Sequence, residues 1–220
     1  MTPAAPRILF LVRHGRSDEG SDDMTSTPRG PQWDPPLDAT GREQAGLLAR
    51  RLATMEPQPA VVVCSTMRRT RETVAPFVDL AGVEVAFDDE LIEAHIGEWE
   101  NKPFEEIITL DEHMLSNWRN QDSIWSHAPG GETLADFRGR VSSAIERILR
   151  DHPVGNVVVV AHGGVINAYI GEVLGYEQEM FFLPENTSIN SVVVEGDRRQ
   201  IRFLNDVRHL TTPHLFGEGP

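Results

Sequence analysis

The sequence predicts an α/β domain in which helices are layered on a mostly parallel β-sheet. Two observations predict this class. Continuous apolar, β-prone runs, such as ILFLV at 8–12 and VVVVA at 157–161, are typical of strands buried on both faces. Amphipathic stretches with helical spacing separate such runs, and alternation of strands with helices indicates a layered α/β fold. The 220 residues suffice for a single domain over 1–220, with frayed ends expected at 1–6 and 211–220.

Three strands and two helices are expected in the first part of the chain. The expected strands are 8–12, 60–64 and 82–87, and the expected helices are 41–55 and 65–80. Thr40 is the expected N-cap of the first helix and Ser65 of the second, because a hydroxyl oxygen accepts the free amides of a first turn. The loop 15–36 is rich in Gly, Ser, Asp and Pro, and loops of this length are typically functional or disordered.

The second part of the chain continues the alternation. The expected elements are a short helix at 104–118, a long amphipathic helix at 132–151, a strand at 156–161, a helix at 163–174, and strands at 189–195 and 200–204. A Gly-Asp turn joins the last two strands. The stretch 88–131 is less regular and holds Trp99, Trp118 and Trp125, which are expected in the core or in a pocket wall.

Polar residues follow the carboxyl ends of three expected strands. Arg13 and His14 follow the first strand, 65–69 follows the second, and 162–164 follows the strand at 156–161. In parallel sheets these ends share one edge, where α/β folds bind ligands. An arginine fork donates two parallel hydrogen bonds to phosphate, a neutral histidine can attack phosphorus, and helix-start amides add donors. The sequence therefore predicts an oxyanion pocket at this edge.

Composition and charge argue against several other function classes. Twenty Lys+Arg against 34 Asp+Glu give a net charge of −14, which disfavours general binding to nucleic acids or anionic membranes. The single cysteine, Cys64, excludes an intrachain disulfide and is expected to be a small buried apolar residue. No metal and no cofactor are expected, because the histidines outside the strand ends lack metal-ligand spacing. The apolar run at 8–12 is too short for a secretory or membrane-spanning segment, so we expect a cytoplasmic protein.

Seven segments resemble, in order and spacing, the motifs of one known family. They are LVRHGRS (11–17), PLDATGREQA (36–45), CSTMRRTRET (64–73), LIEAHIGEWEN (91–101), PGGET (129–133), VVAHGGVI (159–166) and NTSI (186–189). This set is similar to the histidine phosphatase superfamily, which also includes cofactor-dependent phosphoglycerate mutases. The resemblance implies a three-layer sandwich whose mostly parallel central sheet is flanked by helices. Met67 and Thr70 stand where the family motif has Leu and Ala.

The resemblance implies a role for each matching site residue. His14 resembles the nucleophile that forms a phosphohistidine. Arg13, Arg69 and His162 resemble the clamp around the phosphoryl oxygens. Glu93 resembles the general acid that protonates the leaving oxygen and then, as a base, activates water.

The choice of the second arginine follows from the family spacing. Arg69 lies four residues after the serine of its motif, whereas Arg68 and Arg71 would point elsewhere on a helix, into solvent. Arg16, which directly follows the RHG triplet, either contacts a second anionic group of the substrate or faces solvent. The full set of expected substrate contacts is Arg13, Arg16, Ser17, Arg69, His162 and Gly163.

Departures from the family pattern favour a phosphatase over a mutase. Gly20 and Ile96 stand where mutases commonly have Asn and Tyr, and 101–131 holds no Arg-Arg pair to bind a substrate carboxylate. We therefore expect a phosphomonoesterase acting on a small phosphorylated metabolite. The alternative is a 2,3-bisphosphoglycerate-dependent, phosphoglycerate mutase-like phosphotransferase. A third hypothesis, a non-catalytic phospholigand-binding protein, has no need of the intact acid Glu93. The sequence leaves open whether the chain forms a homo-oligomer.

Overall fold

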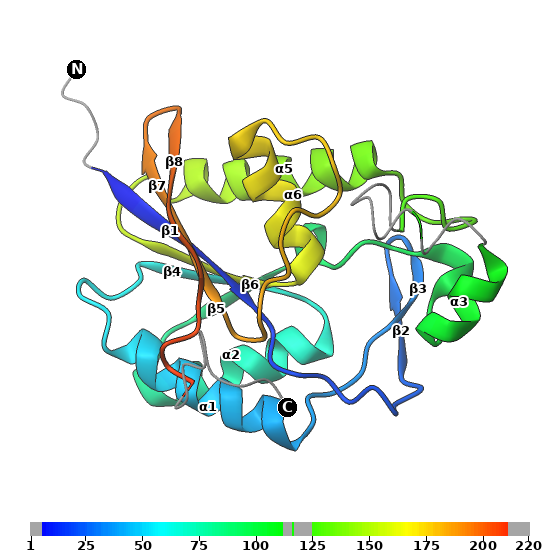
Figure 1. Cartoon of the computed structure of the whole chain (residues 1–220). Coiled ribbons are helices and arrows are strands. Elements are labelled where there is room, and N and C mark those ends of the chain that lie inside the picture. Colours follow the sequence, from blue (N-terminus) through cyan, green and yellow to red (C-terminus); the bar gives the residue numbers. More distant parts are fainter. Residues whose placement is uncertain (1–5, 112–115, 117–124, 211–220) are drawn as a thin grey trace.

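A central β-sheet with helices on both faces forms the body of the molecule (Figure 1). The computed structural model describes residues 6–111, 116 and 125–210. Within them the main sheet has the strand order β5-β4-β6-β1-β7-β8. Its strands are β1 (Arg7–Arg13), β4 (Val61–Ser65), β5 (Val85–Asp88), β6 (Val157–Ala161), β7 (Ile189–Glu195) and β8 (Arg198–Asp206). The first four are parallel, and β7 and β8 are antiparallel to their neighbours. The predicted α/β class with a mostly parallel sheet is confirmed.

Two pairs of helices cover the two faces of the sheet. Helices α1 (Ala39–Ala53) and α2 (Arg68–Ala81) pack on one face, and α5 (Leu134–Asp151) and α6 (Gly163–Leu174) pack on the other (Figure 1). Successive side chains of a strand point to opposite faces. Accordingly, Phe10 and Val12 join the core under α1 and α2, whereas Leu9 and Leu11 join the core under α5 and α6. Burial on both faces explains why this strand is apolar at every position.

Most predicted elements lie within a few residues of the observed ones, but two predicted helix caps are wrong. Asp38, not Thr40, caps α1, because its Oδ1 accepts the Gly41 amide at 2.7 Å. Helix α2 begins at Arg68, and Ser65 ends β4 instead of capping the helix. The first amide of α2 donates to both carboxylate oxygens of Asp34, at 2.8 and 2.9 Å. Reading neighbouring residues alone could not find a cap that a distant segment supplies.

The segment predicted as a loop at 15–36 contains a β-hairpin. Its strands are β2 (Met24–Thr27) and β3 (Gly30–Trp33), and Gly30 adopts a positive φ of 124° where the hairpin turns. The strands are only four residues long and mostly polar, so they lack the apolar pattern by which strands are recognised. The hairpin matters for function because its end carries Gln32, Trp33 and Asp34 toward the carboxyl edge of the main sheet.

The middle of the chain is described in part. Helix α3 (Phe104–Leu110) accounts for the start of the helix expected at 104–118, and 112–115 and 117–118 lie outside the described residues. The expected frayed ends likewise lie outside them, except for Pro6. Two short 3-10 turns, η1 (Asp89–Leu91) and η2 (Gly97–Trp99), precede α3. No helix in the described part of the chain is both long and apolar enough to cross a membrane.

Candidate active site

Four connections at the carboxyl edge of the parallel strands bring the predicted site residues together. His14 follows β1, Arg69 lies in the first turn of α2 after β4, Glu93 follows η1 after β5, and His162 lies between β6 and α6. A cavity of about 390 Å³ opens here, and its lining includes all the predicted residues except His162 and Arg16. His162 lies fully buried beside it, with its ring centroid 5.2 Å from that of His14. The expected convergence on one sheet edge therefore occurs.

The His14 ring is held in one tautomer. Its Nδ1 lies 2.7 Å from the Gly15 carbonyl oxygen, which only accepts hydrogen bonds, so Nδ1 carries the proton. Burial, followed by the charges of Arg69 and Arg13, lowers the pKa of His14 well below 6.5. The ring is therefore neutral at neutral pH, and its lone pair is on Nε2. A neutral imidazole with a free nitrogen is the form that acts as a nucleophile.

His162 is oriented by the strand end next to it. Its Nε2 lies 2.9 Å from Ser65 Oγ, and its buried Nδ1 has no hydrogen-bond partner among the described residues. Burial lowers the pKa of His162 well below 6.5, and the charge of Arg69 adds to this effect. A serine hydroxyl that donates to Nε2 leaves the ring proton on Nδ1. In that tautomer the buried Nδ1 carries an N–H that no described group accepts.

The two arginines are aimed by main-chain carbonyls. Arg69 Nη1 donates to the Trp33 carbonyl at 3.0 Å and lies 3.4 Å from Asp34 Oδ1. Arg13 Nη1 donates to the carbonyl of Pro184, and its buried Nε has no partner in the described part of the chain. Burial lowers the pKa of both side chains, yet a guanidinium stays charged at any working pH. Each arginine therefore carries a fixed positive charge, and its remaining guanidinium N–H groups can donate to an anion.

The Glu93 carboxylate is held against the start of α6. Its Oε2 accepts the Gly164 amide and its Oε1 accepts the Ala94 amide, both at 3.0 Å. A side chain at position 164 would place its Cβ 2.3 Å from Glu93 Oε1, so it would displace the carboxylate from this position. The second glycine of the HGG sequence is thus explained by the close approach of the acid.

Sequence reasoning missed three residues that shape this site. Arg140 of α5 is buried and donates to the main-chain carbonyls of Ile92, at 2.9 Å, and Glu93, at 3.1 Å. Gln32 Nε2 also donates to the Glu93 carbonyl, at 3.2 Å, and Asp34 holds Arg69. Of these three residues, only Arg140 could have been noticed in the sequence, because its charge interrupts the apolar stripe that α5 buries.

Several other predicted or considered residues lie away from the cavity. Arg16 donates to the carboxylate of Asp38 and to Thr40 Oγ1, and it does not line the cavity. Arg68 and Arg71 are exposed. Cys64 is fully buried under α1 and α2, and burial raises the pKa of its thiol to about 12. Of the predicted substrate contacts, Arg16 and His162 do not line the cavity, and only His162 has its ring next to that of His14.

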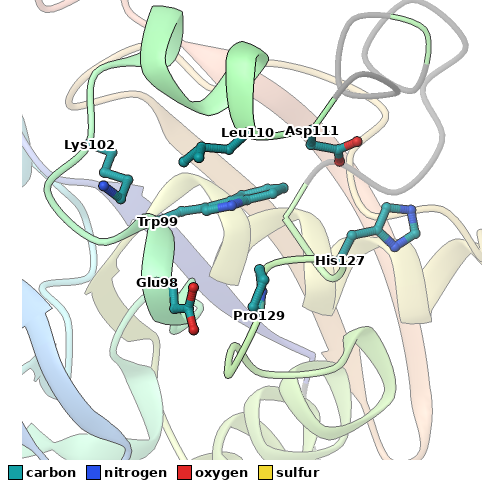
Figure 2. Close-up of a pocket in the computed structure, with 7 residues that line it drawn as sticks. All are labelled: Glu98, Trp99, Lys102, Leu110, Asp111, His127 and Pro129. Atoms are coloured by element: carbon teal, nitrogen blue, oxygen red, sulfur yellow. The ribbon is translucent and has the colours of Figure 1, made fainter.

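A larger hollow of about 700 Å³ lies beside α3 and contains none of the predicted site residues. In Figure 2 the Trp99 indole crosses its middle, with Leu110 and Pro129 on opposite sides. Trp99 is itself buried in a small apolar cluster, as expected from the sequence. Among the described residues, no group of three or more His, Cys, Asp or Glu side chains is arranged to hold a metal ion.

Comparisons with known proteins agree with this geometry. Residues 9–207 match the model of the histidine phosphatase superfamily (branch 1). Glucosyl-3-phosphoglycerate phosphatase from Mycolicibacterium vanbaalenii is 33% identical over 180 residues, which cover 77% of this chain and 75% of the relative. A Serratia proteamaculans protein named "Probable phosphoglycerate mutase GpmB" is 29% identical over 222 residues, covering 94% of this chain and 96% of that protein.

A solved structure extends the likeness to three dimensions. The complex of a mycobacterial glucosyl-3-phosphoglycerate phosphatase with inorganic phosphate has a TM-score of 0.75 to this structure at 25% identity. The match covers 92% of this chain and 99% of that one. Since the family model spans β1 to β8 and takes in every motif quoted above, the chain belongs to branch 1 of the histidine phosphatase superfamily.

Proposed function

We propose that the protein is a phosphomonoesterase that hydrolyses a small phosphorylated metabolite through a phosphohistidine on His14. The neutral His14 ring carries the proposal. Its Nδ1–H is bound to the Gly15 carbonyl, its Nε2 has no hydrogen bond to a described residue, and the charges of Arg69 and Arg13 act on it. A nucleophile next to fixed positive charge is what phosphoryl transfer requires, because that reaction depends mainly on positioning and charge stabilisation.

The first step transfers the phosphoryl group to the enzyme. His14 Nε2 attacks phosphorus, a P–N bond forms, and the bond to the ester oxygen breaks. Arg13, Arg69 and the His162 Nδ1–H stabilise the phosphoryl oxygens. The leaving alkoxide takes a proton from the Glu93 carboxyl, a transfer that typically contributes about 10²–10⁴-fold.

The second step returns the enzyme to its starting state. Glu93, now a carboxylate, accepts a proton from water as the water oxygen attacks phosphorus. The P–N bond breaks, inorganic phosphate leaves, and Glu93 is again protonated. No metal or organic cofactor takes part in this sequence, because the positive charge comes from side chains.

The mutase alternative differs only in what accepts the phosphoryl group from His14. A mutase must keep water away from the phosphohistidine and must hold the carboxylate of phosphoglycerate. Ile96, not a tyrosine, lines the cavity here, which supports water as the acceptor. The relatives include proteins named as phosphatases and as mutases, so the experiment must measure both activities.

The deciding experiment follows two reactions in one preparation. Phosphate release from a panel of phosphate esters is measured with and without 2,3-bisphosphoglycerate, beside interconversion of 2- and 3-phosphoglycerate. We expect release without the bisphosphate, and no release by His14→Ala. Isomerisation that outpaces release roughly a hundredfold and depends on the bisphosphate would establish the mutase instead. Ester binding without either reaction would establish the non-catalytic alternative.

A further inference from the structure

The cavity that holds the arginines also has an apolar wall. Segments from four regions of the chain build it: the end of β3, the residues before η2, the start of 125–129, and 180–184. The wall consists of Trp33, Ile96, Trp125, Met180, Leu183 and Pro184. Leu183 is 64% exposed although it lines the cavity. An exposed large apolar side chain at a cavity is a place where a ligand can bury apolar surface.

Gln32 and Glu100, two polar side chains of the cavity lining, already have partners, whereas the buried Nε1 of Trp125 has none among the described residues. Gln32 Oε1 accepts from the Thr27 hydroxyl at 2.9 Å, and its amide nitrogen donates to the carbonyls of Glu93 and Ala94. Both the oxygen and the nitrogen of the Gln32 side-chain amide therefore hydrogen-bond to neighbouring segments. The alcohol part of a substrate consequently meets apolar surface here more than polar groups.

Both carboxylate oxygens of Glu100 also have hydrogen-bond partners, and the side chain adds negative charge. Its Oε1 accepts the Ile96 amide at 3.0 Å, and its Oε2 accepts the Trp33 amide at 2.9 Å. These two hydrogen bonds hold parts of the wall together. Glu100 also places a carboxylate beside the wall, and Glu19 places another in the lining.

The charged side chains of the described lining are two arginines and three glutamates. The arginines, Arg13 and Arg69, both act on His14, where the phosphoryl group binds. The glutamates are Glu19, Glu93 and Glu100. A second anionic group on the substrate would be repelled by these carboxylates, and repulsion is stronger in a cavity than in bulk water.

We infer that the substrate is a phosphomonoester whose alcohol part is apolar and carries no second anionic group, such as an alkyl or aryl phosphate. The inference rests on the proposed phosphatase function and narrows it. It separates this chain from an enzyme that recognises the carboxylate of a phosphorylated acid.

The test compares two esters with the same leaving group. Hexyl phosphate and its derivative with a carboxylate at the far end differ only where the wall and the lining carboxylates would act. We expect kcat/KM to be at least about tenfold higher for hexyl phosphate. Equal values, or a preference for the carboxylated ester, would overturn the inference while leaving the phosphatase function standing.

A pair of leucine variants locates the effect. Leu183→Ala should lower the ratio of kcat/KM for hexyl to ethyl phosphate by about fivefold, because it removes apolar contact with the longer chain only. Leu174→Ala is the matched control, since Leu174 is 54% exposed at the end of α6 and does not line the cavity. An unchanged ratio in Leu183→Ala would contradict the assigned wall.

A binding measurement covers the case in which no ester is turned over. Calorimetry with the two hexyl esters on the His14→Ala variant reports the same selectivity without chemistry. Tighter binding of the uncharged chain supports the substrate class even if the proposed hydrolysis fails. Equal or tighter binding of the carboxylated chain refutes it.

Discussion

Arg140, on the helix layer behind the sheet, donates a hydrogen bond from Nη2 to the main-chain carbonyl of Glu93 at 3.1 Å. The same guanidinium also donates to the carbonyl of Ile92. Glu132 neutralises it, with distances of 2.6 and 2.8 Å from its oxygens to Nε and Nη2. A buried arginine with all these partners fixes the segment that carries the proposed acid, so we propose Arg140 as a positioning residue for Glu93.

Replacement of Arg140 should therefore impair the acid function. Arg140→Lys keeps the charge but loses the fork. Loss of one charged hydrogen bond costs ~1.5 kcal/mol, so we expect kcat for alkyl phosphates to fall about tenfold. The kcat for aryl phosphates should fall less. The control is Arg147→Lys on the same helix, where the exposed side chain pairs with Asp88 at 2.7 Å. Equal losses for both ester classes would show that Arg140 acts on stability alone.

Asp34 plays the corresponding part for Arg69. Its carboxylate accepts the first amide of α2 and also lies 3.4 Å from Arg69 Nη1. Asp34→Asn keeps an oxygen for the amide but removes the charge. We expect kcat/KM to fall about tenfold, with an unchanged melting temperature. Asp23→Asn, which alters an exposed partner of Arg68, is the control and should leave kcat/KM within about twofold. An Asn variant as active as wild type would limit Asp34 to helix capping.

The core of the site could be predicted from the sequence for a physical reason. Strands buried on both faces are apolar throughout, so the polar residues that end them stand out, and parallel topology brings those ends together. His14 and His162 were found in this way. Glu93 lies beyond the short η1 turn and was identified through the family motif alone.

The supporting residues could not be predicted, because their roles depend on contacts between distant segments. Arg140 is 47 residues from Glu93, and Asp34 is 35 residues from Arg69. The direction of Arg16 likewise depends on Asp38, which the start of α1 brings beside it. The hairpin of β2 and β3 was missed since its short polar strands resemble a loop.

Arg69 should not tolerate a change to lysine. The side chain is buried and its fork is aimed by Trp33 and Asp34, so Arg69→Lys keeps the charge but not the bidentate geometry. We expect kcat/KM to fall at least about tenfold. Arg68→Lys and Arg71→Lys provide controls at exposed neighbouring positions and should stay within about twofold of wild type. If Arg68→Lys were the damaging change, the alignment of this motif would be off by one residue.

Stability should decrease as the pH falls through the ordinary histidine pKa. In the folded protein the pKa of His162 lies well below 6.5, so the unfolded chain binds a proton there first. The free energy of unfolding therefore drops between pH 6.5 and the lower folded pKa, and this contribution is fully present above pH 6.5. Urea titrations at about pH 7.5 and 5.5 should show a smaller drop in His162→Gln, by about 1.4 kcal/mol. An identical drop in both proteins would contradict a neutral His162.

The acid role of Glu93 predicts a dependence on the leaving group. Glu93→Gln keeps an oxygen for the Gly164 amide but has no proton to give to the departing oxygen. An alkoxide needs that proton far more than a phenoxide does, because the phenoxide is the weaker base. We therefore expect kcat to fall by about 10²–10⁴-fold for alkyl phosphates and clearly less for nitrophenyl phosphate. With the aryl ester, loss of the base should instead slow the second step, so that phosphohistidine accumulates and quenching with alkali traps an acid-labile, base-stable label on His14. A variant that lost both activities equally, with no trapped label, would require a different acid.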